Sequence, residues 1–377
     1  MKSITRYVLL IILFFNPASA WSANQYEKLE KRIRVLEKDK REFKSQNPST
    51  ATGISRRFNP SLSVNGLFLG TYNSQGNFDS TKENRTGLKI QEVEIRMAAY
   101  VDTFLRADFT FAFEGTSAIE IEEGIIDAVV TRNLSFRTGK FLAPFGKHNQ
   151  LHTHAFPFID KPIASEEILG EEGLNEIGLG VSYLLPTDWF SDVTFQVLDG
   201  ANTNQFNGPG GSDFAYLVRQ NNLWDLSDET TMELGGSYVY GKNSLASTSS
   251  FDNKTHLAGA DLTFKWKPAG REAYKTFIWQ TEFLGSFREQ TQEGWYTLIQ
   301  HQFAKQWWVQ GRYSGYTIPH GTNKTDKNQW SALLAWVPSE FSALRLQYNH
   351  LNQATADEHQ VFMQLNFTMG SHPAHKY

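Results

Sequence analysis

The sequence predicts an all-β fold, a transmembrane antiparallel β-barrel of about 16 strands that follows a short N-terminal coiled-coil helix. Three observations lead to this prediction. The chain begins with an export signal, its composition is aromatic yet polar on average, and side chains alternate with a period of two from Leu62 to Met369. Together they favour a barrel in a bacterial outer membrane over a soluble protein.

The N-terminus has the layout of a secretory signal peptide. Lys2 and Arg6 precede the apolar run Tyr7–Phe15, and Ala18-Ser19-Ala20 supplies a small-x-small cleavage pattern. The alternative is a single membrane anchor, but this run is too short to span a bilayer. We therefore expect residues 1–20 to be removed after Ala20 on export.

The composition of the rest of the chain fits a membrane barrel. Aromatic residues make up 14% of the chain, Gly is frequent, and mean hydropathy is only −0.43. A barrel combines these properties because only every second residue of a strand meets lipid. The chain has no Cys, so no disulfide framework holds it. We expect no cofactor and no nucleic-acid partner for this composition.

Residues 21–45 are predicted to form a periplasmic coiled coil. Leu29, Ile33, Leu36 and Phe43 recur at helical spacing among Glu and Lys, as in an a/d seam. A single solvated helix is the alternative, but a seam of Leu and Ile needs a partner. Residues 46–60 are polar, contain two prolines, and are predicted to be a linker.

Residues 61–377 are assigned to the barrel because apolar and polar side chains alternate there. Leu344, Leu346 and Tyr348, for example, alternate with Arg345 and Gln347. A soluble β-sandwich or propeller would show the same period with the apolar face inward, and the signal peptide and aromatic content favour the membrane barrel. The predicted strands are 62–72, 88–101, 105–114, 118–131, 134–145, 177–186, 189–199, 213–226, 231–241, 258–267, 277–288, 294–305, 307–318, 328–338, 344–349 and 361–369.

If the apolar set faces lipid, charged side chains of both signs line the lumen. A mixed wall of this kind suits a water-filled pore and selects neither anions nor cations by itself. The alternative is that these groups form ion pairs between adjacent strands. The set comprises Glu92, Glu94, Arg96, Arg106, Asp108, Glu114, Asp261, Lys265, Lys267, Glu282, Arg288, Arg312 and Arg345.

One long irregular insertion, 147–176, is predicted to fold into the lumen and narrow it. Long loops are usually functional or disordered, and the apolar content of this one argues against disorder. His152 and His154 are candidate metal ligands because imidazoles together with carboxylates bind zinc, nickel or copper; ordinary pore lining is the alternative. The predicted constriction residues are Arg106, Arg137, Lys140, Lys147, His148, His152, His154, Asp160, Glu166, Glu167, Glu171 and Glu172.

The stretch LSFRTGKFLAPFG (134–146) resembles the phosphate-selective porin O and P family. The matching residues are Gly139, Lys140, Phe141, Pro144, Phe145 and Gly146, and WQTEFLGSF (279–287) resembles a later strand of that family. The resemblance implies a trimeric porin of 16 strands. Phosphate selectivity in the family depends on a ladder of Arg and Lys, whereas loop 147–176 holds two cations, Lys147 and Lys161, against six acids: Asp160, Glu166, Glu167, Glu171, Glu172 and Glu176. The resemblance therefore carries the fold and not the substrate.

The function that these observations predict is passive diffusion of small hydrophilic solutes or ions, including anions such as phosphate. The partners expected are membrane lipid and lipopolysaccharide, and two further copies in a homotrimer. The alternatives are a metal-associated pore that uses the His and acidic loop, a barrel enzyme, and a structural barrel. No G-x-S-x-G motif is present, and no Ser or Asp constellation singles out His350 or His359, which argues against an enzyme. Residues 370–377 interrupt the alternation, and they end either a shorter last strand or a periplasmic tail.

Overall fold

A computed structural model of the chain describes residues 60–75, 86–115, 119–206, 213–244, 253–270, 274–320, 323–352 and 357–370. All of the described residues belong to one compact unit, Pro60–Tyr377. The predicted signal peptide, coiled coil and linker up to residue 59 lie outside the described residues, as does the tail from residue 371. No helix among the described residues is long and apolar enough to cross a membrane.

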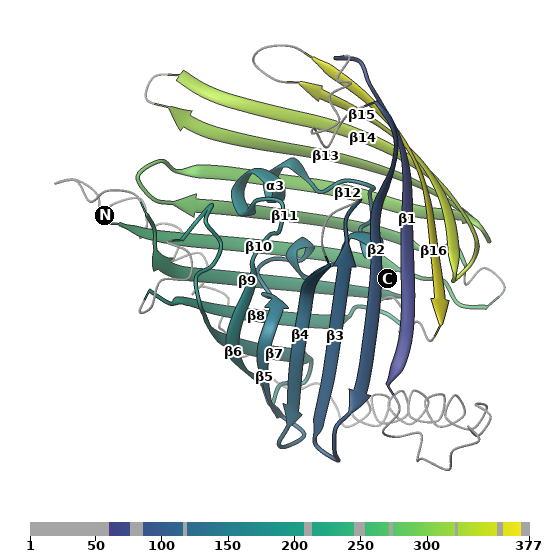
Figure 1. Cartoon of the computed structure of the whole chain (residues 1–377). Helices are drawn as coiled ribbons and strands as arrows, with labels where there is room; N and C mark the ends of the chain where they lie inside the picture. Colours follow the sequence, from purple (N-terminus) through teal and green to yellow (C-terminus); the bar gives the residue numbers. More distant parts are fainter. Residues whose placement is uncertain are drawn as a thin grey trace. The chain divides into compact units, whose positions relative to one another are not determined.

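The described residues form a closed barrel of 16 antiparallel strands, in which each strand pairs with its sequence neighbours and β1 pairs with β16 (Figure 1). This confirms the predicted fold class and strand number. The strands are β1 Ser61–Asn73, β2 Gly87–Tyr100, β3 Leu105–Phe113, β4 Glu120–Val129, β5 Leu134–Leu142, β6 Asn175–Leu184, β7 Phe190–Leu198, β8 Ala215–Asp225, β9 Thr230–Lys242, β10 Lys254–Trp266, β11 Phe277–Phe287, β12 Gln292–Ala304, β13 Trp307–His320, β14 Asn323–Ser339, β15 Ser342–Asn352 and β16 Glu358–Gly370.

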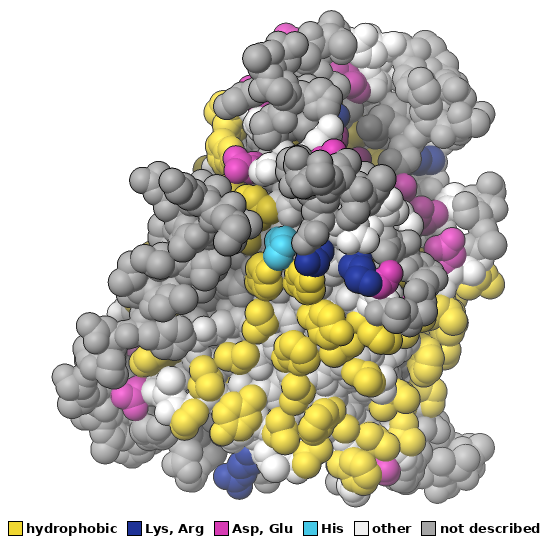
Figure 2. Space-filling model, turned by 90° about the vertical axis from the view of Figure 1, so that its left-hand side faces the viewer, with side chains coloured by type: hydrophobic (Ala, Val, Ile, Leu, Met, Phe, Trp, Pro, Cys, Tyr) yellow, Lys and Arg dark blue, Asp and Glu magenta, His cyan; other side chains and the backbone are white. Residues whose placement is uncertain are grey.

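The two faces of the strands have the orientation of a membrane barrel. On β15, Arg345 and Gln347 face inward and are buried, whereas Leu346 faces outward and is half exposed. The other strands also carry exposed large hydrophobic side chains, which cover a broad area of the outer surface (Figure 2). A soluble sandwich would bury this apolar set, so the orientation excludes that alternative.

Two neighbouring pairs of strands contain β-bulges that change which side chains face inward. Between β1 and β2, Leu67 pairs with Glu92 and Phe68 with Ile90, which leaves Gln91 unopposed. Between β3 and β4, Thr110 pairs with Glu123 and Phe111 with Ile121, which leaves Glu122 unopposed. An extra residue re-aims the side chains beside it, so consecutive residues can face the lumen.

The connection between β5 and β6 runs from residue 143 to 174 and is called the inner segment below. It contains η1 (His148–Gln150), η2 (Thr153–Ala155) and α3 (Ile163–Leu169). It ends two residues earlier than the predicted loop because Asn175 and Glu176 already pair with Leu142 and Phe141. Helix α3 contacts β11, β12, β13 and β14 inside the ring of strands (Figure 1).

Candidate functional site

The inner segment enters the lumen through a tight turn at Pro144-Phe145-Gly146. Gly146 has a φ of +66°, and a Cβ atom at this position would lie 1.7 Å from Oε1 of Glu282 on β11. The backbone N–H of Gly146 donates to Oγ of Ser237 at 3.1 Å, and the N–H of His148 donates to Glu282 at 3.2 Å. Only glycine fits this conformation and close approach, so the turn directs the chain inward against β9 and β11.

Apolar side chains hold the inner segment against the inner wall. One cluster joins Phe145 and Ile168 to inward-facing leucines such as Leu257 and Leu284. A second cluster joins Phe158 to Tyr296 and other inward residues of β12, β14 and β16. Burying each side chain of this size contributes about 1.5–3 kcal/mol, so these patches of the wall serve as docking surfaces for the segment.

Asp160 is the main polar anchor of the inner segment. Its carboxylate accepts hydrogen bonds from Arg312 at 2.7 Å, Gln347 at 2.6 Å, Asn349 at 2.9 Å and Gln329 at 3.0 Å. Arg312 also donates to the backbone oxygen of Asp160 at 2.8 Å. These donors come from β13, β14 and β15, so one side chain ties the segment to three strands.

Further polar contacts surround this anchor. Arg345 donates to the backbone oxygens of Phe156 at 2.8 Å and Pro157 at 2.7 Å. Lys147 forms an ion pair with Glu233 at 2.5 Å, and Lys327 forms one with Glu167 at 2.5 Å. Of the remaining predicted constriction acids, Glu166, Glu171 and Glu172 are exposed.

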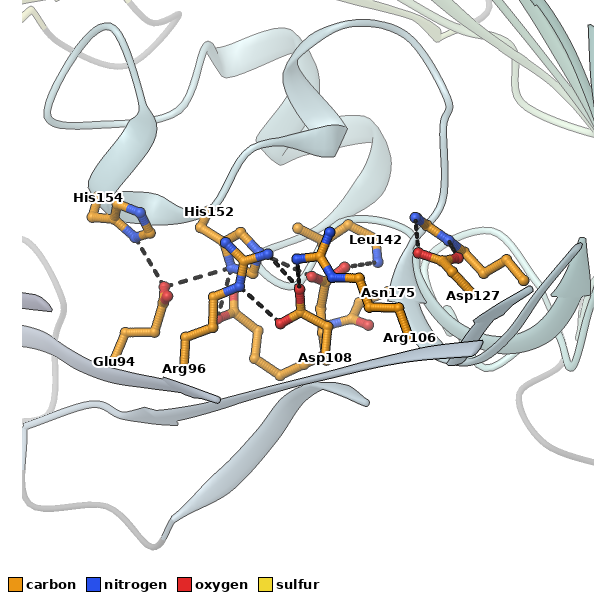
Figure 3. A network of polar contacts seen from close by, with 12 residues as sticks. Glu94, Arg96, Arg106, Asp108, Asp127, Leu142, His152, His154 and Asn175 are labelled. Atoms are coloured by element: carbon orange, nitrogen blue, oxygen red, sulfur yellow. Dashed lines mark hydrogen bonds and ion pairs between the residues drawn. The ribbon is translucent and has the colours of Figure 1, made fainter. Parts of the chain in front are cut away.

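A ladder of charges lies on the facing wall, on β2 to β5, near the barrel end at which β2 joins β3 and β4 joins β5 (Figure 3). Arg96 binds Asp108 through two hydrogen bonds of 2.8 and 2.5 Å, and Arg106 binds the same carboxylate at 3.1 Å. Arg137 binds Asp127 through two hydrogen bonds of 2.8 and 3.0 Å. The pairs of Arg96 with Asp108 and of Arg137 with Asp127 join adjacent strands, whereas Arg106 and Asp108 lie on the same strand, so three guanidinium groups share two carboxylates.

Not every predicted pore-lining residue belongs to that ladder. Nζ of Lys140 donates to the backbone oxygen of Ile121 at 2.9 Å. Asp261, which was predicted to line the lumen, is not part of the ladder and forms an ion pair with buried Arg219 at 2.7 Å.

His152 and His154 point from the inner segment toward glutamates on the strands (Figure 3). Nδ1 of His152 lies 3.0 Å from Glu122 and 3.5 Å from Glu94, and its Nε2 lies 3.0 Å from Glu123. Nδ1 of His154 lies 2.9 Å from Oε2 of Glu94, which is also the Glu94 oxygen that faces His152. The carboxylates beside these imidazoles therefore come from β2 and β4, not from the acids of the loop itself.

The histidines of the segment differ in electrostatic environment. Burial lowers the pKa of His148 well below its ordinary value, and the positive charges of Lys161 and Arg312 lower it further. Its ring packs against Phe156 and Tyr296, at centroid distances of 4.5 and 6.2 Å.

His152 is shifted in the opposite direction. Burial alone would lower the pKa of His152, but its close contacts with the carboxylates of Glu122 and Glu123 and the negative charge of Glu94 raise it well above its ordinary value. His148 is therefore a neutral packing residue, whereas His152 faces negative charge.

Sequence reasoning missed Glu122, Glu123 and Asp127. Glu122 and Glu123 are adjacent in sequence, so a strict alternation places one of them outside the lumen, and the bulge on β4 brings both inside. The break in alternation within Glu120-Ile121-Glu122-Glu123-Gly124 was the available signal.

Comparison with known proteins identifies the fold. No protein-family model matches the chain. An uncharacterized protein of Aquifex aeolicus (strain VF5) is 26% identical over 357 residues, which cover 81% of this chain and 74% of that protein.

Solved structures of outer-membrane proteins superpose on the barrel at low sequence identity. They include an anion-selective porin from Comamonas acidovorans (TM-score 0.57, 13% identity, 82% of this chain and all of that one). The outer membrane channel DcaP of Acinetobacter baumannii has a TM-score of 0.56 at 11% identity, over 85% of this chain and all of that one. OmpT of Vibrio cholerae, in its trimer form, has a TM-score of 0.55 at 9% identity, over 82% of this chain and all of that one. The fold is thus that of outer-membrane porins, and membership of the phosphate-selective family stays a prediction.

Proposed function

We propose that this chain is a passive pore of a bacterial outer membrane for small hydrophilic solutes and ions, narrowed by the inner segment. One observation carries the proposal. Helix α3 and Asp160 of the segment dock on β11–β15, and His152 and His154 reach β2 and β4, whereas Arg106 and Arg137 on β3 and β5 keep 44% and 41% of their side-chain surface exposed. Charged groups that stay hydrated beside a docked segment support an aqueous path between the two.

The proposed path attracts small anions weakly and is not built for phosphate. Arg96, Arg106 and Arg137 share the carboxylates of Asp108 and Asp127, which leaves these five side chains, counted without the neighbouring glutamates of β2 and β4, one positive charge in excess. Arg96 and Arg137 are each engaged by both oxygens of a carboxylate, so a phosphate group would have to displace an aspartate to gain a bidentate contact. Arg106 makes a single contact in the ladder and is the guanidinium most open to a passing anion.

Planar-bilayer recording tests the proposal. We expect ion conductance from the folded protein and a reversal potential in a KCl gradient that indicates a weak preference for chloride. The double variant Arg106→Gln, Arg137→Gln should shift the reversal potential toward potassium, whereas Glu172→Gln, an exposed acid away from the ladder, should leave it unchanged. Chloride current should not be blocked by phosphate at low concentration. A folded protein without conductance would refute the pore.

We propose further that the pore is a homotrimer in contact with lipid and lipopolysaccharide, exported with cleavage after Ala20. The trimer form of OmpT, at full coverage of that chain, and the predicted coiled coil of residues 21–45 support this assembly. Mass measurement of detergent-solubilised protein should give three chains, and N-terminal sequencing should begin at Trp21. Deletion of residues 21–45 should weaken the assembly.

We propose no catalytic role for the barrel. His350 on β15 and His359 on β16 stack on each other at a centroid distance of 4.8 Å. His350 also lies 3.6 Å from Asp357, and His359 lies 2.8 Å from the hydroxyl of Tyr348, so within the described ranges neither ring contacts a Ser hydroxyl as a catalytic base would. Esterase and peptidase assays on the folded protein should therefore give no turnover above that of the denatured protein.

A further inference from the structure

Five side chains from three parts of the fold bring potential metal-ligand atoms together beneath the inner segment. Glu92, Glu94 and His154 form one group of three, and Glu94, Glu122 and His152 form a second, each with its ligand atoms within 4.8 Å of one another. Glu94 belongs to both groups. Its contacts of 2.9 Å with His154 and 3.5 Å with His152, and the contact of 3.0 Å between His152 and Glu122, resemble the spacing of about 3.4 Å between ligands that share an ion at about 2.1 Å.

In the described part of the chain, Glu92 contributes a buried carboxylate oxygen without a hydrogen-bond partner to this cluster. Its residue is 3% exposed, and among the residues that the structure describes its Oε1 atom has no hydrogen-bond partner. Glu94, two residues along the same face of β2, is also buried, so two carboxylates lie side by side out of water. A buried carboxylate without a partner carries a large desolvation penalty, which either a proton or a bound cation removes.

The orientation of His152 adds a second, independent feature of a metal site. Its Nε2 atom lies 3.0 Å from Glu123, which accepts the N–H of Leu142 at 2.9 Å and is thereby held in place. Nδ1 then faces Oε2 of Glu122 and Oε2 of Glu94, and in the described structure neither Nδ1 nor Oε2 of Glu122 has a partner in hydrogen-bond geometry. A histidine that ligates a metal through one nitrogen usually donates the other to a carboxylate in this way.

We propose that Glu92, Glu94, Glu122, His152 and His154 bind a divalent transition-metal ion, with zinc as the matching probe, and that the ion fastens the inner segment to β2 and β4. Glu123 is a positioning residue that orients His152. The metal site does not depend on the proposed pore function.

The donor set decides the class of ion. One imidazole nitrogen with two carboxylate oxygens in each group suits zinc and its first-row neighbours. Magnesium and calcium prefer oxygen ligands alone and several waters, which a buried mixed site does not offer. One ion held by Glu94 together with ligands of both groups would satisfy the geometry, and so would two ions, one in each group, with Glu94 between them. The stoichiometry of binding distinguishes these forms.

Metal titration of the full folded chain in detergent, after treatment with EDTA, tests the site. Calorimetry with Zn²⁺ should show one or two ions bound per chain, and Mg²⁺ at equal concentration should not compete. Glu94→Gln removes a ligand from both groups and should abolish this binding, whereas Glu123→Gln should weaken it about 10- to 100-fold. Zinc X-ray absorption should show only nitrogen and oxygen ligands at about 2.0–2.2 Å.

Matched variants separate this site from others on the chain. Glu172→Gln, an exposed glutamate of the same segment, should bind zinc as the parent does. His350→Ala tests the exposed His350–His359 pair as an adventitious site. If Glu94→Gln misfolds, Glu92→Gln serves as the second ligand variant, and an unchanged β-sheet circular dichroism spectrum establishes that a variant has folded.

The outcomes of the titration are distinct. Zinc binding that survives Glu94→Gln and Glu92→Gln, or that is lost in His350→Ala, overturns the proposal. Absence of zinc binding by a protein that conducts ions overturns it as well and leaves the pore intact. Zinc binding by a protein that never conducts supports the site and refutes the pore. With both in place, zinc should also slow hydrogen exchange in residues 147–156.

Discussion

Replacement of Asp160 by Ala tests whether the inner segment is held in place by its polar anchor. The substitution removes the acceptor of four side-chain hydrogen bonds, from Arg312, Gln329, Gln347 and Asn349. It leaves the backbone oxygen of Asp160, which still accepts from Arg312. The apolar contacts of neighbouring Phe158 and Ile159 are also unchanged.

The expected destabilisation follows from the burial of Arg312. Its side chain is 1% exposed, and leaving a buried charge without its partner costs about 3–5 kcal/mol. Two features reduce this figure. The carboxylate of Asp160 is 23% exposed, and Arg312 keeps hydrogen bonds of 3.1 Å to Gln329 and to Ser331. We therefore expect a loss of about 2–4 kcal/mol, which multiplies the displaced population of the segment by about 30 to 900.

Two measurements read out this displacement. Single-channel recordings of Asp160→Ala should show frequent excursions to larger conductance, and hydrogen–deuterium exchange should accelerate in peptides from residues 147–174. Glu167→Gln is the matched control, because its ion pair with Lys327 is about 30% exposed on both sides and is worth at most about 1 kcal/mol. Exchange and conductance in Asp160→Ala that equal those of Glu167→Gln would refute the role of Asp160 as the anchor.

Three further predictions concern the same segment. Gly146→Ala should lower the stability of the folded barrel in thermal unfolding. The positive φ alone should cost about 1–3 kcal/mol, and overlap of the new Cβ with Glu282 should add to this loss. An unchanged unfolding midpoint would contradict the inward turn. His148 should make the seated segment less stable as pH falls through the ordinary histidine pKa of about 6.5, by up to about 1.4 kcal/mol per pH unit, because its pKa is lowered in the folded state and protonation favours the displaced state, whereas His152, whose pKa is raised, acts in the opposite sense above that pH. His148→Phe should remove one proton from that pH dependence in hydrogen exchange, and an identical slope in parent and variant would count against it. Lys147→Ala should change stability by less than about 1 kcal/mol in the same thermal assay, since its ion pair with Glu233 is partly exposed, and a larger loss would show that the pair anchors the segment.

The strands were predictable because, in regularly paired strands of a closed barrel, successive side chains alternate between the interior and the exterior. Leu344 and Leu346 contact the exterior, Arg345 and Gln347 face the interior, and this rule holds along β15 and around the ring. The choice between lipid and core for the apolar face needed more than the alternation, and the predicted export signal and the aromatic content supplied it. The inward fold of the insertion was predictable from its apolar residues, which dock on inward-facing leucines.

The partners of the inner segment were less predictable, because they depend on which residues of distant strands meet. Asp160 was a predicted pore-lining acid, yet it meets Arg312 across 152 residues of sequence and is tied to β14 and β15 as well. Register between strands sets such meetings, and a pattern of period two carries no information on register between distant strands.

The bulges explain why the candidate metal site escaped the pattern. Alternation on β4 places either Glu122 or Glu123 inside, and a site with only one of them lacks either the second carboxylate ligand or the group that orients His152. One extra residue opposite Thr110 and Phe111 places both inside, where Glu122 faces Nδ1 and Glu123 faces Nε2 of the same ring. The neighbouring bulge at Gln91 acts alike on β2, since it keeps Glu92 opposite Leu67 while Gln91 contacts the inner segment. The two bulges bring side chains of β2 and β4 to one imidazole-bearing segment, which regular alternation along those strands would not do.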